Sequence, residues 1–149
     1  MSPAGLRRTL LRFAIAGSLP LACAGPTLHT PEPYRSDAQA AAALETRAAQ
    51  YCAALYPDAE QQPTRPFVTD GCSRTFDREW DLLCCIEHDI AYWCGGTREQ
   101  RRQADAAFGE CVAANTAKPV GLTMRFGVRI GGHPLVPTSD RWGYGHDYR

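Results

Sequence analysis

The chain has 149 residues, a length that suits one domain with a modest hydrophobic core. Its 16 basic side chains balance its 16 acidic ones and no basic run stands out, so the composition argues against nucleic acid as a partner. Seven cysteines in so short a chain favour an exported, disulfide-bonded protein over a cytosolic one.

The N-terminus has the layout of a secretory signal. Three arginines precede an apolar run from Phe13 to Ala22 that is too short to span a bilayer. We expect residues 1–24 to be a signal peptide cleaved before Gly25, although the stretch also fits a lipoprotein signal that leaves Cys23 as a lipid-modified N-terminus. Either route exports the protein, as a secreted or periplasmic form, and removes Cys23 from disulfide chemistry. Six cysteines remain and predict three bridges: Cys52, Cys72, Cys84, Cys85, Cys94 and Cys111.

The first expected helix follows a leader. Residues 25–35 are rich in proline and lack periodicity, which predicts a flexible leader to a single domain over residues 36–149. A helix is expected from Ser36 to Tyr56, because Ser36 and Gln39 form a capping box. Its apolar stripe consists of Leu44, Ala48, Tyr51 and Leu55, with Cys52 beside it.

A helical hairpin is expected next. Residues 57–79 read as loop, and two helices follow at about 80–94 and 98–115. The junction CGGTREQ supplies two glycines for the end of the first helix, and Thr97 with Gln100 forms a capping box for the second. So short a junction makes the two helices antiparallel neighbours.

The tail over residues 116–149 leaves two readings open. In GLTMRFGVRIGG the apolar residues alternate as in a strand, yet Leu122, Phe126 and Ile130 also fall at helical spacing. The last segment, HPLVPTSDRWGYGHDYR, is rich in proline, glycine and aromatic residues. We expect it to wrap the surface or to pack over the mouth of a pocket.

Chemically useful residues gather on the first hairpin helix. Cys84, His88 and Tyr92 form one stripe, and Cys85 with Asp89 forms the neighbouring stripe. His88 and Asp89 are consecutive and point about 100° apart, so they can border one pocket but cannot bond face to face. A carboxylate that orients His88 must therefore come from another element.

The second hairpin helix offers such a carboxylate. Asp105 precedes Cys111 by six residues, and His88 follows Cys84 by four. If a bridge joined Cys84 to Cys111, His88 and Asp105 would lie about 6 and 9 Å inward along antiparallel axes. The spacing then predicts contact between His88 and Asp105 across the helix pair.

These motifs resemble those of secreted phospholipases A2. CCIEHDIAY, residues 84–92, resembles the family pattern Cys-Cys-x-x-His-Asp-x-Cys-Tyr, and ADAAFGEC resembles its partner helix. The loop DGCSRTFD is similar to the prokaryotic phospholipase A2 pattern DGCSxxPD, with Phe76 in place of the proline. The resemblance covers residues 68–112, and it lacks the family's bridge at the positions of Ala91 and Ala104.

The resemblance implies a fold and a disulfide pairing. The fold is mainly α, small and disulfide-rich, with an antiparallel helical hairpin of the phospholipase A2 type, an N-terminal helix and an irregular C-terminal tail. The resemblance implies the pairs Cys84–Cys111 and Cys72–Cys85. The two cysteines left over then form the third pair, Cys52–Cys94.

The resemblance also implies catalytic roles. His88 would be the general base that activates water, Asp105 would orient it, and Tyr92 would support Asp105 by a hydrogen bond. The substrate would be the sn-2 ester of a phospholipid in a membrane surface, attacked by a monomeric enzyme.

A calcium ion is implied beside the base. Its ligands would be the carboxylates of Asp89 and Asp77 and the backbone carbonyl of Arg78, which are oxygen donors that suit this hard cation. The ion would polarise the ester carbonyl and stabilise the developing oxyanion. The multi-glycine calcium loop of the animal enzymes is missing from the chain.

Several of these residues have plainer readings. Asp77 could equally cap a turn, Asp70 is expected to be a turn residue, and the tail pair His146 and Asp147 is expected to be surface polarity. Core packing rather than a lipid-facing rim is expected for three aromatic residues near the hairpin, Phe76, Trp80 and Trp93. Zinc is disfavoured because adjacent cysteines ligate one tetrahedral ion poorly and oxidise on export; the ligands would be Cys84, Cys85, His88 and Cys94.

Two other functional classes remain beside the hydrolase. One is a non-catalytic disulfide-stabilised module for envelope binding or inhibition, and the weaker one is a lipoprotein that only structures an outer membrane. The hydrolase is favoured because a vestigial site has no physical need to keep all of His88, Asp89, Tyr92 and Asp105.

Overall fold

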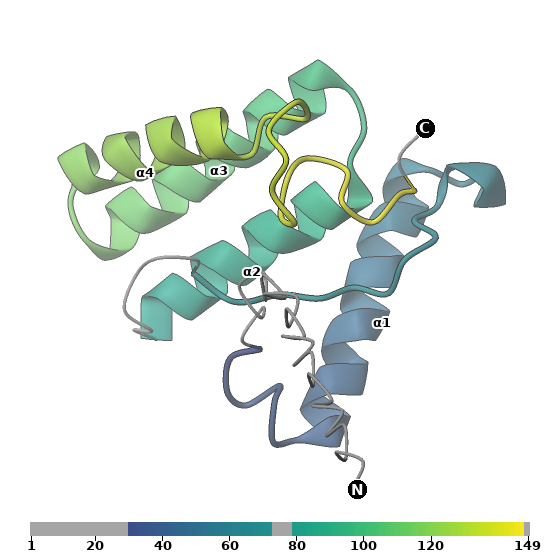
Figure 1. Cartoon of the computed structure of the whole chain (residues 1–149). Helices are drawn as coiled ribbons and strands as arrows, with labels where there is room; N and C mark the ends of the chain where they lie inside the picture. Colours follow the sequence, from purple (N-terminus) through teal and green to yellow (C-terminus); the bar gives the residue numbers. More distant parts are fainter. Residues whose placement is uncertain (1–29, 73–78, 148–149) are drawn as a thin grey trace, which may run out of the picture.

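The computed structural model describes residues 30–72 and 79–147, with only the backbone of residues 79–81. The described chain is helical and contains no strand, which confirms the mainly α class (Figure 1). Its elements in chain order are α1 (Ala38–Leu55), the short 3-10 helix η1 (Ala59–Gln61), α2 (Glu79–Cys94), α3 (Arg98–Asn115) and α4 (Lys118–Gly131). Outside the described residues lie the expected signal with Cys23, the residues Phe76, Asp77 and Arg78, and the side chain of Trp80.

Each α-helix packs against its neighbour in the chain: α1 against α2, α2 against α3, and α3 against α4 (Figure 1). The buried side chains form one cluster between α1, α2 and the C-terminal tail, and a second between α2, α3 and α4. Trp93 belongs to the first cluster and is 7% exposed, which confirms the core reading for this residue. Among the described helices, none is both long and apolar enough to cross a membrane.

The start of α1 differs from the prediction. The cap is Asp37, whose carboxylate accepts hydrogen bonds from the backbone N–H groups of Gln39 and Ala40 at 2.9 and 3.1 Å. The hydroxyl of Ser36 instead donates to Glu32, so it is not available to the helix. The capping box predicted at Ser36 is therefore wrong, because a carboxylate one residue later satisfies the free N–H groups.

The buried stripe of α1 is also narrower than predicted. Leu44, Ala48 and Cys52 are buried against α2, whereas Tyr51 and Leu55 are 41% and 39% exposed. Positions spaced by four residues follow one line along the helix, so a helix that touches one neighbour buries that line alone.

The α2–α3 turn follows the sequence signals. The capping box at Thr97 and Gln100 is present, with N–H to oxygen distances of 2.8 and 3.2 Å. Gly96 has a φ of 124°, and a Cβ there would lie 1.8 Å from the hydroxyl oxygen of Tyr56. That hydroxyl accordingly reaches the turn and donates to the side-chain oxygen of Gln100 at 3.0 Å, which ties the end of α1 to the hairpin.

All three implied disulfides are present. The Cα–Cα distances are 5.5, 5.2 and 5.7 Å for Cys52–Cys94, Cys72–Cys85 and Cys84–Cys111. They tie α1 to α2, the preceding loop to α2, and α2 to α3. The pairing confirms the sequence-based prediction and removes the zinc alternative, because three of its four ligands are oxidised.

Residues 118–131, which the sequence left open between strand and helix, fold into helix α4, so the expectation of an irregular C-terminal tail is wrong for this part. Pro119 stands in its first turn, where a missing N–H costs nothing. Met124 and Val128 pack on the cluster around Phe108 of α3. A Cβ on Gly121 would lie 2.2 Å from the carbonyl oxygen of Gly109, so two glycines let α3 and α4 touch backbone to backbone. A helix forms here rather than a strand because helical spacing places Gly121, Met124 and Val128 on one side, against α3.

The last described residues bind along the C-terminal end of α2 through backbone hydrogen bonds. The backbone N–H groups of Gly143 and Gly145 donate to the carbonyls of Tyr92 and Trp93 at 2.7 and 3.1 Å. His146 Nε2 lies 2.8 Å from the carbonyl oxygen of Cys94 and is only partly exposed, so surface polarity was the wrong reading for this residue.

Candidate functional site

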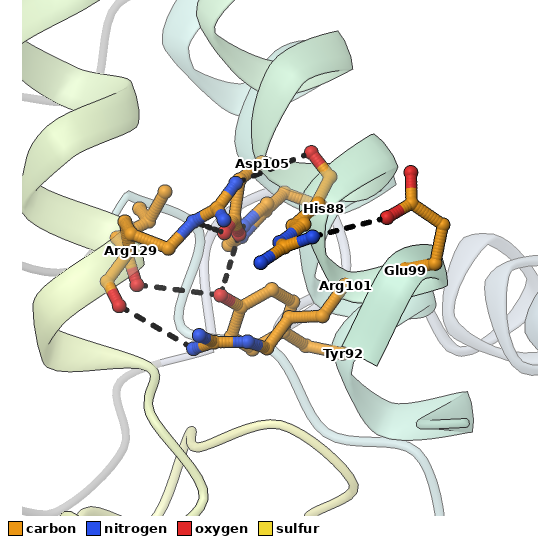
Figure 2. Close-up of polar contacts among 8 residues, drawn as sticks. His88, Tyr92, Glu99, Arg101, Asp105 and Arg129 are labelled. Carbon is orange, nitrogen blue, oxygen red and sulfur yellow. Dashed lines mark hydrogen bonds and ion pairs between the residues drawn. The ribbon is translucent and has the colours of Figure 1, made fainter. Parts of the chain in front are cut away.

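The predicted contact between His88 and Asp105 is present. His88 on α2 is 9% exposed, Asp105 on α3 is fully buried, and His88 Nε2 lies 3.3 Å from Asp105 Oδ1 (Figure 2). The Cys84–Cys111 bridge sets the register of the two helices that brings them together. This contact confirms the spacing argument; the catalytic roles of the two residues stay predictions.

Tyr92 supports the carboxylate as expected. Its hydroxyl donates to Asp105 Oδ1 at 2.6 Å, one helical turn beyond His88 (Figure 2). The imidazole lies between two rings, with centroid distances of 4.1 Å to Tyr92 and 4.8 Å to Phe108. Burial, followed by the hydrogen bond to Asp105, raises the pKa of Tyr92, so this hydroxyl stays protonated and remains a donor.

Arg129 of α4 is a residue that the sequence did not predict in this site. Its Nε lies 2.5 Å from Asp105 Oδ2, an ion pair rather than an aligned hydrogen bond (Figure 2). Two backbone contacts hold the arginine: its Nη2 donates to the carbonyl of Arg102 at 3.4 Å, and its own carbonyl accepts from Arg101 at 3.3 Å. Sequence reasoning could not find it, because α4 was undecided between strand and helix.

The pKa shifts of His88 and Asp105 favour a neutral imidazole beside an ionised carboxylate. Burial lowers the pKa of His88 below its ordinary value, and the contact with Asp105 offsets only part of this. Burial would raise the pKa of Asp105, but the hydrogen bonds from His88 and Tyr92 and the charge of Arg129 leave it lowered. With its Nε2–H directed to Asp105, His88 keeps a lone pair on Nδ1, as a base requires.

The His88 side chain borders a cavity of about 370 Å³ between α2 and α4. Its walls are largely apolar, and they include Tyr92, Phe108, Met124, Val128 and the glycines 127, 131 and 132. Thr138 and Asp140 of the tail also line the cavity. The tail thus wraps the surface and also reaches the cavity, where Asp140 adds an acidic side chain that the sequence did not single out.

Asp89 lines the same cavity next to polar and acidic groups. Its Oδ2 accepts a hydrogen bond of 2.6 Å from the hydroxyl of Thr69, which in turn accepts one from the N–H of Gly71. Burial raises the pKa of Asp89 well above its ordinary value, the Thr69 bond opposes this, and the charges of Asp70 and Asp140 add to it. A carboxylate in this setting favours a proton or a cation.

The residues present fit part of a hard-cation site. Asp89 offers carboxylate oxygens in acidic surroundings, as calcium prefers. No group of three His, Cys, Asp or Glu side chains that could hold a metal occurs within residues 30–72 and 82–147. The other expected ligands, Asp77 and Arg78, fall outside the described residues.

Comparison with known proteins adds no relative. No protein-family model matches the sequence, and no curated protein or solved structure matches it either.

Proposed function

We propose that the protein is an exported, calcium-dependent hydrolase of the phospholipase A2 type that cleaves the sn-2 ester of phospholipids. One observation carries the proposal: the imidazole of His88, held by a buried carboxylate, borders a largely apolar cavity that Asp89 and Asp140 also line. The three disulfides support an oxidising compartment, as export requires.

His88 acts as the general base in this proposal. Its Nδ1 takes a proton from water as the water oxygen attacks the ester carbonyl, and the resulting imidazolium is stabilised by Asp105. The tetrahedral intermediate then collapses, and His88 returns the proton to the leaving lysophospholipid oxygen. Tyr92 and Arg129 hold the two oxygens of Asp105 throughout.

The calcium ion belongs at the acidic side of the cavity. Asp89 would hold it together with Asp77 and the carbonyl of Arg78, and the bound ion supplies positive charge for the ester oxygen. The apolar walls formed by Phe108, Met124 and Val128 suit an acyl chain.

The test is release of fatty acid from phospholipid vesicles by wild type and by His88→Gln, each with calcium and with chelator. We expect wild-type release with calcium to fall about a thousandfold in the variant, because a general base contributes on this scale. His133→Gln is the matched control, since His133 is exposed and does not line the cavity. Equal release by wild type and His88→Gln would end the enzyme claim and favour the non-catalytic disulfide module.

Asp89→Asn tests the calcium ligand through stability alone. The pKa of Asp89 is raised in the folded state, so its ionised form costs stability as the pH rises above the ordinary value for an aspartate. We expect Asp89→Asn to raise Tm in chelator and to abolish the gain of about 2.7 kcal/mol that wild type receives from calcium at a hundred times its Kd. Thermal unfolding measured with calcium and with chelator gives both quantities. If calcium stabilised Asp89→Asn as much as it stabilises wild type, Asp89 would not be a calcium ligand.

A further inference from the structure

Helix α4 carries an apolar stripe that faces away from the protein. Leu122, Phe126 and Ile130 are 56%, 67% and 57% exposed and follow one another at intervals of four residues. They therefore form one line along the helix. Among the described helices α4 packs only against α3, on its other side (Figure 1). Three large exposed apolar side chains in one line mark a surface that meets an apolar partner.

The charges on α4 select the kind of partner. The helix contains Lys118, Arg125 and Arg129 and no acidic residue. These positions also share one line, which runs beside the apolar stripe. Arg129 is turned to Asp105, and Arg125 is only partly exposed, with its side chain close to Gly109 of α3. The outward positive charge therefore comes from the exposed Lys118 and from the exposed part of Arg125. An apolar stripe flanked by cations is the pattern of a helix that lies in the headgroup region of an anionic bilayer.

Length and position agree with that placement. Fourteen residues give a helix about 21 Å long, too short to cross the hydrocarbon core. Met124, Gly127 and Val128 of the same helix line the cavity that holds His88. One face of α4 thus borders the cavity while the adjacent face is exposed and apolar, so a bilayer on the exposed face would lie beside the cavity.

We infer that α4 docks the protein onto anionic phospholipid bilayers, lying parallel to the surface with Leu122, Phe126 and Ile130 inserted. This inference rests on the proposed function only in treating the nearby cavity as the site that receives the phospholipid. The docking surface itself stands on the exposure and charge of α4.

Binding to vesicles of non-hydrolysable diether phospholipids, measured by co-sedimentation in chelator, tests the inference without any chemistry. Leu122→Ser/Phe126→Ser should lower partitioning into phosphatidylglycerol-containing vesicles about tenfold or more, because two inserted side chains are lost. Tyr51→Ser/Leu55→Ser on α1 is the matched control, with the same spacing and similar chemistry, and should stay within about twofold of wild type. Lys118→Glu, at the exposed start of α4, should reduce binding about fivefold or more.

Three results would overturn the docking inference. They are equal loss in the two double variants, equal binding of wild type to neutral phosphatidylcholine vesicles, and a dimer by light scattering that Leu122→Ser/Phe126→Ser dissociates. Hydrolysis of a monomeric short-chain phospholipid measures catalytic activity independently of membrane binding. Absence of that hydrolysis with intact vesicle binding would reject the hydrolase and leave the docking surface standing.

Discussion

Replacing Asp105 with alanine should lower the free energy of unfolding by about 3 kcal/mol, measured by urea denaturation at neutral pH. Asp105 is fully buried and meets His88, Tyr92 and Arg129, so its removal leaves a guanidinium without its counter-charge. The loss lies at the low end for a broken buried pair because the Arg129 side chain is 29% exposed.

A double-mutant cycle separates charge from packing at Asp105. Asp105→Asn keeps the shape of the side chain but leaves Arg129 without its counter-charge, whereas Asp105→Asn/Arg129→Met removes both charges. We expect the double variant to regain part of the stability that Asp105→Asn loses, since neither charge is left buried alone. Additive losses would contradict the ion pair. In the hydrolysis assay Asp105→Asn should lose about a thousandfold, because its amide no longer stabilises the imidazolium.

Removal of the bridge between α1 and α2 is the second large effect. Cys52→Ala/Cys94→Ala opens a loop with a sequence separation of 42, and the chain-entropy relation gives a loss of about 4 kcal/mol. The same relation gives about 3 kcal/mol for Cys72→Ala/Cys85→Ala, whose separation is 13. Urea unfolding of both double variants under non-reducing conditions measures the two losses.

The outcome for the α1–α2 bridge also tests the placement of α1. Among the described helices α1 packs only on α2, and this bridge is the disulfide that joins the two helices. An unchanged unfolding midpoint in Cys52→Ala/Cys94→Ala would mean that non-covalent contacts, such as the packing of Leu44 and Ala48 and the hydrogen bond of Tyr56, hold α1 in place, against our expectation.

The hairpin and its central contact were predictable because local signals and covalent links determine them. Thr97 and Gln100 fix the start of α3 by a capping box that needs no tertiary partner. Once the Cys84–Cys111 bridge is set, helical rise alone brings His88 to Asp105. The sequence therefore contained the core of the candidate site.

The rest of the site depends on contacts across the fold. Arg129 reaches the site from α4, whose course follows from packing at Gly109 and Gly121. Asp140 reaches it from the tail, which backbone hydrogen bonds hold against α2. Short apolar runs fit a strand and a helix equally well, and tertiary contact decides between them. At the start of α1, the sequence argument placed the cap at Ser36, but the carboxylate of Asp37, one residue later, caps the helix instead.

The most direct test of the central claim is hydrolysis of a phospholipid with different acyl chains at sn-1 and sn-2, carried out in ¹⁸O-labelled water. We expect calcium-loaded wild type to release the sn-2 fatty acid with ¹⁸O in its carboxylate, and His88→Gln to do so about a thousandfold more slowly. Release of the sn-1 chain, absence of label in the fatty acid, or an equal rate in His88→Gln would contradict this expectation.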